Sequence, residues 1–326
     1  MRYRLFGNTG RRVSEVGIGT WQLGTRWGTA FNEEEALKVL QASEECGINF
    51  IDTADVYNGG RSEEAIGSFI RGKRDCFFIT TKCGRKLKPH TAEMYTPHAV
   101  SDFIDGSLSR LGTDRIDLLL LHCPPSAVFS RDDIFEELER QKKAGKILYY
   151  GVSIEKIEDG LKAMEYGIDG IEVIFNMFRL KPLDILLPKA EKEGVGIIAR
   201  VPLASGLLTG KFSADTQFEP KDHRTFNRNG ESFDKGETFS GVPYELGLEA
   251  VEELKRLFNT DNLAPVAIRW ILMHPQVSTV IPGASRESQI RQNVIAQDLP
   301  ELSAEQMDGV RRIYDKYLRA DIHPQW

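Results

Sequence analysis

The sequence predicts an α/β fold with a single (β/α)8 TIM barrel, in which eight parallel strands close into a cylinder surrounded by helices. Eight short apolar segments alternate with amphipathic segments along the 326 residues, and no change of composition divides the chain into parts. The alternative is an open doubly wound sheet, but the GxGxxG motif typical of that fold does not follow the first apolar segment. We therefore expect residues 1–326 to form one barrel domain.

The first elements are predicted by a turn sequence and by an apolar run. Arg2–Phe6 and Arg11–Ser14 flank the turn sequence GNTG. This pattern indicates a β-hairpin over residues 1–14 that caps one end of the barrel. The apolar run Glu15–Gly19 follows directly and is expected to be the first barrel strand.

Two helices carry clear signals at their ends. Asn32 is the expected N-cap of the first helix, with Glu35 at the capping-box position. A later helix is expected to open at Thr96-Pro97 and to close at Gly112, because proline suits the first helical turn and glycine the exit.

The remaining strands are short runs of apolar residues. Ile116–His122 is apolar on both faces, as expected for a buried parallel strand. The other strands are expected at Asn49–Thr53, Cys76–Lys82, Ile147–Ser153, Gly170–Phe175, Val195–Ala199 and Ser278–Pro282, with helices near Ser62–Arg71 and Pro265–Met273.

Two segments fall outside this alternation. Residues 213–241 are rich in glycine, aspartate and asparagine and hold few apolar side chains, which predicts a long mobile loop after the seventh strand. Residues 300–326 are expected to form a C-terminal helix and tail. The tail ends at Trp326, and two alternatives are open for it: it approaches the active site, or it packs on the surface.

Composition argues against several classes of function. The chain has 42 basic and 48 acidic side chains, and a net charge of −6 does not favour a nucleic-acid partner. No apolar stretch is long enough to cross a membrane, and the N-terminus lacks the apolar core of a signal peptide. Four scattered cysteines, predicted to lie in core elements, are typical of the reduced thiols of a cytoplasmic protein. They form no CxxC pair, so no metal is expected.

The candidate catalytic residues stand at the C-terminal ends of predicted strands, where barrels of this type carry their active sites. Asp52, Lys82 and His122 end three of the strands, and Tyr57 follows in the loop after Asp52. Each of them alone is an ordinary residue, because a strand-end charge is usually solvated and a lone histidine is usually structural. Their convergence on one rim favours a shared active site.

These four side chains suit proton transfer to a carbonyl oxygen. A phenol has a pKa near 10, and a neighbouring ammonium lowers that pKa by favouring the phenolate. We therefore expect Lys82 to acidify Tyr57, Asp52 to hold Lys82 in place, and His122 to orient the carbonyl oxygen. None of these side chains can deliver a hydride, so a reduction would require a nicotinamide cofactor.

Six motifs, in order along nearly the whole chain, closely resemble those of the aldo-keto reductases. They are GINFIDTADVYNGGRSEEAIG (Gly47–Gly67), FFITTK ending at Lys82, RIDLLLLH ending at His122, PLASGLLTGK (Pro202–Lys211), NLAPVAIRWILMHPQV (Asn262–Val277) and VIPGASRESQIRQN (Val280–Asn293). The resemblance implies that Asp52, Tyr57, Lys82 and His122 form the catalytic tetrad, with Tyr57 as the general acid.

The same resemblance implies a set of binding residues. Trp21, Tyr57 and His122 are expected to contact the substrate. Cofactor contacts are expected from Gly19, Thr20, Trp21, Asp52, Ser153, Glu172, Asn176, Arg200, Pro202, Leu203, Ser205, Gly206, Leu208, Gly210, Lys211, Ile281, Gly283, Arg286, Gln289 and Asn293. The guanidinium of Arg286 suits a 2′-phosphate, which favours NADPH/NADP, with NADH as the alternative.

Three positions depart from the family pattern. Ile154, Glu172 and Arg200 stand where many members carry Asn, Gln and an aromatic residue. We expect Glu172 and Arg200, on neighbouring strands, to form an ion pair that holds the guanidinium flat against the nicotinamide. That positive charge would favour NADPH over NADP⁺.

The sequence therefore predicts an NADP-dependent oxidoreductase that reduces aldehydes or ketones, with a small-molecule carbonyl substrate and neither a nucleic acid nor a membrane as partner. It indicates no oligomeric state. Two alternatives remain. One is a cofactor-binding regulatory subunit with little turnover, and the other is a Schiff-base aldolase that uses Lys82 as its nucleophile.

Overall fold

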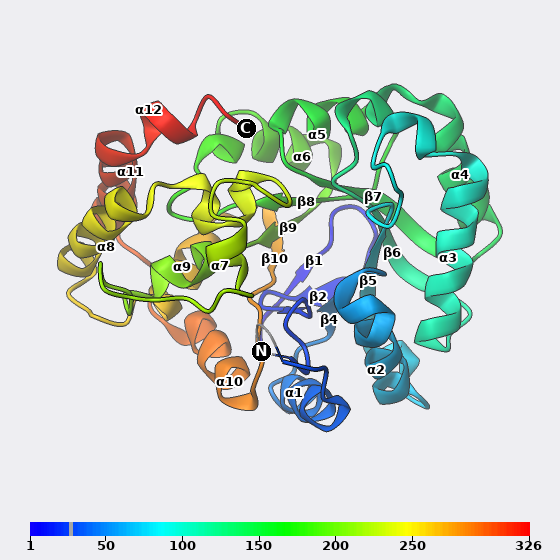
Figure 1. Cartoon of the computed structure of the whole chain (residues 1–326), viewed down its shortest axis with the longest axis horizontal. Coiled ribbons are helices and arrows are strands. Elements are labelled where there is room, and N and C mark those ends of the chain that lie inside the picture. The colour runs from blue at the N-terminus through cyan, green and yellow to red at the C-terminus, as the bar shows by residue number, and fades with distance from the viewer. Residues whose placement is uncertain (26–28) are drawn as a thin grey trace.

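The computed structural model describes residues 1–25 and 29–326, and it confirms the predicted barrel. Eight parallel strands pair in chain order from β3 to β10, and the bridges Val16–Val280 and Gly19–Gly283 join the last strand to the first (Figure 1). The strands are β3 (Ile18–Gly19), β4 (Phe50–Asp52), β5 (Phe78–Cys83), β6 (Ile116–His122), β7 (Ile147–Ile154), β8 (Gly170–Ile174), β9 (Gly196–Arg200) and β10 (Val277–Val280).

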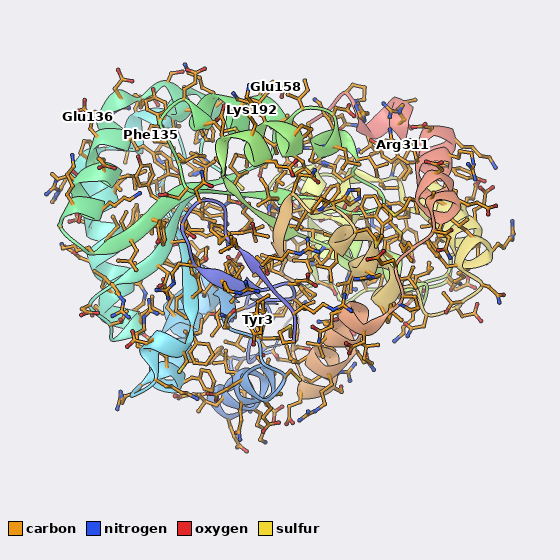
Figure 2. All side chains as sticks on the ribbon, turned by 180° about the vertical axis from the view of Figure 1, so that it is seen from behind. Tyr3, Phe135, Glu136, Glu158, Lys192 and Arg311 are labelled. Atoms are coloured by element: carbon orange, nitrogen blue, oxygen red, sulfur yellow. The ribbon has the colours of Figure 1, made fainter. Side chains whose placement is uncertain are left out.

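The predicted hairpin is present and seals the N-terminal end of the barrel. β1 (Tyr3–Leu5) pairs antiparallel with β2 (Arg12–Ser14), and Figure 2 shows this pair lying across the barrel on the side opposite to the view of Figure 1. Phe6 is fully buried beneath the hairpin, with its ring 5.3 Å from that of Phe78 inside the cylinder. Aromatic and aliphatic side chains therefore fill this end of the barrel.

Helices cover the outside of the cylinder, and the predicted end signals are confirmed where they are strongest. Asn32 and Thr96 accept hydrogen bonds from the backbone N–H groups of Glu35 and Ala99, both at 3.1 Å, and Gly112 closes its helix in the left-handed region. The helices are α1 (Glu33–Glu45), α2 (Arg61–Ile70), α3 (Pro97–Leu111), α4 (Asp132–Lys143), α5 (Ile157–Met164), α6 (Leu186–Glu193), α7 (His223–Phe226), α8 (Tyr244–Phe258), α9 (Ala264–Leu272), α10 (Glu287–Val294), α11 (Ala304–Tyr317) and α12 (Arg319–Ile322).

Most strands begin or end one to three residues away from the predicted bounds, and one burial assignment differs from the sequence prediction. β5 begins at Phe78 because residues Arg74–Cys76 form a 3-10 turn instead of the start of the strand. Cys76 is consequently exposed, so the prediction that all four cysteines lie in core elements was wrong. Cys83 and Cys123 are buried, Cys46 is partly buried, and all four thiols are free.

Residues 213–241 contain short helices joined by turns. Besides α7 they include the 3-10 turns η7 (Lys235–Glu237) and η8 (Phe239–Gly241), and Phe239 is buried. The mobility predicted for this segment stays a prediction. α11 packs on α8, and the tail beyond α12 ends with a buried Trp326. None of the described helices is long and apolar enough to span a membrane.

Candidate active site

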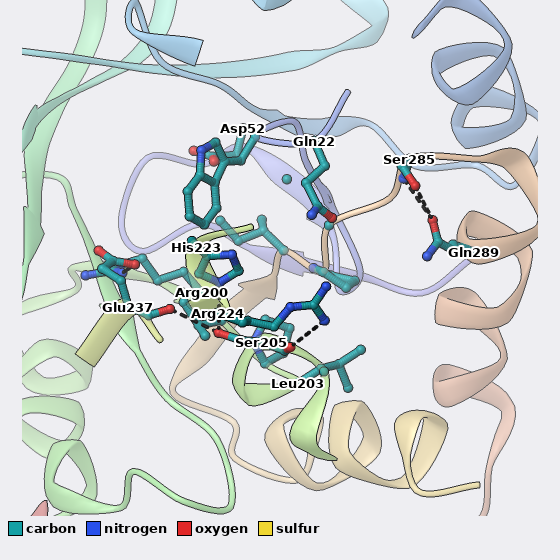
Figure 3. A pocket seen from close by; sticks show the side chains of 18 of the residues that line it. Gln22, Asp52, Arg200, Leu203, Ser205, His223, Arg224, Glu237, Ser285 and Gln289 are labelled. Carbon is teal, nitrogen blue, oxygen red and sulfur yellow. Dashed lines mark hydrogen bonds and ion pairs between the residues drawn. The ribbon is translucent and has the colours of Figure 1, made fainter. Parts of the chain in front are cut away.

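A cavity of about 570 Å³ lies at the C-terminal ends of the strands, opposite the hairpin (Figure 3). Most of the residues predicted from the sequence line it, which brings segments from both ends of the chain to one place. The predicted residues on its wall are Gly19, Trp21, Asp52, Tyr57, His122, Ser153, Glu172, Arg200, Pro202, Leu203, Ser205, Gly206, Lys211, Ile281, Gly283, Arg286 and Gln289.

Lys82 connects the predicted catalytic residues beneath the cavity floor. Its ammonium donates to both carboxylate oxygens of Asp52 at 2.6 and 2.7 Å and to the carbonyl oxygen of Thr53 at 3.0 Å. The same nitrogen lies 3.4 Å from the phenol oxygen of Tyr57. Parallel pairing of β4 with β5 sets Asp52 beside Thr80, and this register places the two charged side chains side by side. The sequence prediction that an ammonium adjoins the phenol is met in this geometry.

The expected direction of the Tyr57 pKa was wrong. Burial raises the pKa of Tyr57 above its ordinary value, and the ammonium of Lys82 opposes this rise without reversing it. The sequence pattern showed the neighbouring charge but not the desolvation of the phenol, which is the larger effect here. Tyr57 is therefore protonated at neutral pH and can donate a proton.

Lys82 and Asp52 have perturbed pKa values of their own. Burial disfavours the ammonium of Lys82, but the carboxylates of Asp52 and Glu172 outweigh burial and raise its pKa. Burial and the negative charge of Glu172 raise the pKa of Asp52, although Lys82 opposes them. Lys82 is thus firmly charged between two carboxylates, with Glu172 at 3.3 Å.

His122 faces Tyr57 across the cavity. The two rings are 6.0 Å apart and nearly perpendicular. Burial, together with the positive charges of Arg85 and Lys82, holds the pKa of His122 well below its usual range. The imidazole is therefore neutral at physiological pH and carries one N–H donor. Its Nδ1 has no hydrogen-bond partner among the described residues, so the tautomer is not fixed by the protein.

Arg200 has two carboxylate partners, of which the sequence predicted one. Glu172 lies 3.7 Å from its Nε, as expected for neighbouring strands, but Glu237 lies closer, at 2.6 Å from Nη1. Glu237 comes from the 3-10 turn η7, far along the chain, and Figure 3 shows it pointing toward Arg200. Burial opposes the charge on Glu237, but Arg200 and Arg85 lower its pKa on balance. The guanidinium is therefore clamped between two negative charges.

The chain matches the model of the aldo/keto reductase family over residues 15–315. It belongs to this family. It is 30% identical over 319 residues to the "Uncharacterized oxidoreductase YqkF" of Bacillus subtilis (strain 168), covering 95% of this chain and 96% of that protein. It is also 30% identical over 334 residues to a "Probable voltage-gated potassium channel subunit beta" of Oryza sativa subsp. japonica, covering 96% of both chains.

A solved structure agrees with this assignment. The aldo-keto reductase AKR11C1 from Bacillus halodurans, in its holo form, superposes with a TM-score of 0.78 at 25% identity, covering 99% of both chains. Members of the family are oxidoreductases that bind nicotinamide cofactors.

The motif Pro202–Lys211 forms a backbone cradle on the wall of the cavity. Ser205, Gly206 and Gly210 have φ angles of 54°, 96° and 77°, in the left-handed region. This conformation turns the chain sharply within η6 (Ala204–Thr209). The backbone at position 210 requires glycine, because a Cβ atom there would come within 2.7 Å of the carbonyl oxygen of Asp261.

The opposite wall of this aldo/keto reductase suits the adenosine end of a dinucleotide. Arg286 is the N-cap of α10, and Gln289 in the first turn accepts hydrogen bonds from the N–H and hydroxyl of Ser285 at 2.8 and 3.2 Å. A side chain added at Gly283 would meet only open space and Gln22 Oε1 at 4.0 Å. The guanidinium of Arg286, the first turn of α10 and the open space at Gly283 thus lie on the wall of one cavity, and these residues fit a nicotinamide dinucleotide.

Six predicted residues do not line the cavity. Asn176 donates from its amide to the carbonyl oxygen of Val201 at 2.9 Å and to Ser240 Oγ at 2.7 Å. Its side chain therefore joins the segments that contain Val201 and Ser240. Ile154 carries no polar side-chain atom, but its carbonyl oxygen accepts a hydrogen bond from Arg200 Nη2 at 3.0 Å. The predicted residues outside the wall are Thr20, Lys82, Asn176, Leu208, Gly210 and Asn293.

Sequence reasoning missed several polar residues of the wall. Three of them, His223, Arg224 and Glu237, come from segment 213–241, which the sequence predicted only as a long polar loop (Figure 3). The others are Gln22, Thr25, Thr209 and Ser285. Arg224 is held by the two carboxylate oxygens of Asp222, at 3.0 and 2.6 Å. The segment has no hydrophobic periodicity that would indicate which charged side chains face the cavity. Its high content of charged residues was the one sequence feature that pointed to a polar role.

Cys123, Glu155 and Glu237 bring potential metal-ligand atoms within 4.8 Å of one another. Both carboxylates already have cationic partners. Arg85 lies 3.1 Å from Glu155 and Arg200 lies 2.6 Å from Glu237. A cation would have to displace a guanidinium from this cluster, so it is poorly suited to a metal ion. The expectation of no metal stays a prediction.

A second hollow of about 410 Å³ adjoins the first and shares Trp21, Tyr57 and His122 with it. Arg85, Asn58 and Phe233 line the second hollow and not the first. The three residues predicted to contact substrate thus stand where the two hollows meet.

Proposed function

We propose that this aldo/keto reductase reduces an aldehyde or ketone to an alcohol, with NADPH as the hydride donor and Tyr57 as the general acid. The observation that carries the proposal is the contact of 3.4 Å between Lys82 Nζ and Tyr57 Oη on the cavity that His122 also faces. Phenol, ammonium and imidazole together provide the groups that a carbonyl oxygen needs as it gains negative charge.

Each residue has a separate role in the proposed reaction. Tyr57 holds a proton at Oη and transfers it to the substrate oxygen. Lys82 stabilises the phenolate that remains, because its ammonium stays charged beside Asp52. His122 is neutral and orients the carbonyl oxygen through a ring N–H. A bound dihydronicotinamide would supply the hydride, and the aromatic ring of Trp21 lies on the wall of both hollows.

NADPH is proposed over NADH on the basis of Arg286. Arg286 is the N-cap of α10 and lies on the cavity wall. Its guanidinium and the backbone N–H groups of the first turn of the helix can together bind a 2′-phosphate. Ser153 donates to Glu172 at 3.3 Å, and both line the cavity, so we propose that they share the carboxamide contact that Ile154 lacks.

The experiment that tests the proposal is consumption of NADPH against a panel of aldehydes and ketones, with NADH in parallel. We expect turnover with NADPH, faster than with NADH, and no turnover in Tyr57→Phe although that variant still binds NADPH. Absence of turnover in the wild type across the panel, with NADPH bound, would support the regulatory alternative.

That alternative, a cofactor-binding regulatory subunit, is favoured by one observation. A relative named as a potassium channel β subunit matches over nearly the whole chain. The complete set of Asp52, Tyr57, Lys82 and His122 argues for turnover. An aldolase mechanism is less well supported, because a nucleophilic amine must be neutral and Lys82 lies between two carboxylates.

A further inference from the structure

Residues 234–241, which we call the strap, run from the outer surface of the barrel end to the active-site cavity. On the inner side Glu237 binds Arg200 at 2.6 Å and forms part of the cavity wall. The backbone carbonyl oxygen of Glu237 also accepts a hydrogen bond from Ser205 Oγ at 3.1 Å. Ser205 belongs to the backbone cradle of Pro202–Lys211, so the strap contacts both Arg200 and this cradle.

The outer side of the strap is bound by the tail of the chain. Trp326 donates from Nε1 to Asp234 Oδ1 at 2.9 Å, across 92 positions of the sequence. Only 4% of the surface of Trp326 is exposed, which is unusual for a residue beyond the last helix. The carboxylate oxygen that it binds also accepts a hydrogen bond from the N–H of Gly236 at 2.7 Å, which caps the turn carrying Glu237.

Arg179 binds Trp326 and the strap together. Its guanidinium lies 3.6 Å from the centre of the Trp326 ring, and its Nη1 donates to the carbonyl oxygen of Ser240 at 3.2 Å. The indole also packs directly on the strap backbone, because a side chain at Gly241 would come within 2.3 Å of the Trp326 ring. Gly241 has a φ of 79°, so both its conformation and its contact favour glycine.

These contacts form one continuous chain from the tail to the site. Trp326 fixes Asp234, Asp234 caps the turn η7, and that turn presents Glu237 to Arg200. The strap can lift from the cavity only if the indole contacts on its outer side are broken as well. Trp326 itself does not line the described cavity.

We propose that Trp326 is a positioning residue, which holds the strap closed over the bound cofactor and keeps Glu237 on Arg200. The inference rests on the proposed function, because it takes NADPH to be the occupant of the cavity. It predicts that the tail controls how fast the cofactor leaves, without taking part in the chemistry.

The test is the dissociation rate of NADPH from the full-length protein. Bound NADPH is chased with excess NADP⁺ and followed by its fluorescence. Trp326→Ala should release NADPH about tenfold faster, the factor that corresponds to a loss of about 1.4 kcal/mol from the closed state. Trp326→Phe keeps a ring over Arg179 but lacks the N–H for Asp234, so its rate should lie between the two. Gln325→Ala, a neighbouring tail substitution, should leave the rate unchanged.

A double variant separates positioning from a general loss of stability. If Trp326 acts through Glu237, then Trp326→Ala combined with Glu237→Gln should release NADPH no faster than the faster of the two single variants. A wild-type rate in both Trp326 variants, or single effects that multiply in the double variant, would overturn the proposal. Should Trp326→Ala fail to fold, the same comparison is made with Trp326→Phe. If the wild type binds no NADPH, the proposed function fails first.

Discussion

Replacing Lys82 with methionine removes the ammonium that lies between Asp52, Glu172 and Tyr57. Asp52 then loses two hydrogen bonds, of 2.6 and 2.7 Å, and is left as a buried carboxylate with no compensating charge. Removing one partner of a buried pair destabilises a protein by about 3–5 kcal/mol. We expect a loss of that size in the free energy of unfolding, measured by urea denaturation at pH 7, and a loss of about 10²–10⁴-fold in kcat/KM for carbonyl reduction.

The stability defect of Lys82→Met should depend on pH. Without the ammonium the folded-state pKa of Asp52 rises further, so the folded chain binds a proton that the unfolded chain has already released. Stability therefore falls as the pH rises from about 4, the ordinary pKa of aspartate, toward the folded pKa. Lowering the pH from 7 to 5 should thus recover part of the difference between Lys82→Met and the wild type.

A matched variant separates charge from catalysis. Asp52→Asn combined with Lys82→Met removes both charges, so most of the lost stability should return while the activity stays low. If this double variant is as unstable as Lys82→Met alone, the unpaired Asp52 carboxylate is not the cause of the defect. If Lys82→Met keeps wild-type kcat/KM, the role given to the ammonium is refuted.

Three further predictions concern the site. Tyr57→Phe should abolish turnover and leave the Kd for NADPH within about twofold of wild type, because it removes one hydroxyl that acts only in proton transfer. Steady-state assays measure the turnover and fluorescence titration measures the Kd. Residual turnover in this variant would contradict the role of Tyr57 as the general acid. Arg200→Tyr should tighten NADP⁺ relative to NADPH, because a cation beside the oxidised ring is removed; an unchanged Kd ratio refutes the charge argument. Arg286→Ala should lower the ratio of kcat/KM with NADPH to kcat/KM with NADH by about tenfold. If this ratio is unchanged, Arg286 does not bind the 2′-phosphate.

The sequence predicted the parts of this structure that local chemistry determines. Helix starts at Asn32 and Thr96 follow from capping side chains, and each strand follows from its own apolar run to within a few residues. Once these strands close into a barrel, Asp52, Lys82 and His122 must meet at one rim. That inference needs only the order of the strands, not their exact boundaries.

What the sequence did not show depends on contacts between distant segments. Glu237 and His223 lie in a stretch without hydrophobic period, so nothing local indicates that they face the cavity. Glu237 nevertheless supplies the shortest ion pair of Arg200, which the sequence assigned to Glu172. The pKa of Tyr57 was misjudged for a related reason, since desolvation depends on every segment that encloses the phenol.

In the proposed reaction Tyr57 gives its proton to the substrate from a phenol that burial keeps protonated. The most direct measurement is the single-turnover rate in both directions across pH. Because burial raises the pKa of Tyr57 above its usual range, reduction should be independent of pH through neutrality. Alcohol oxidation, which needs the phenolate, should rise about tenfold per pH unit below that pKa. An oxidation rate that levels off near pH 7, or a reduction rate that falls there, would contradict the account.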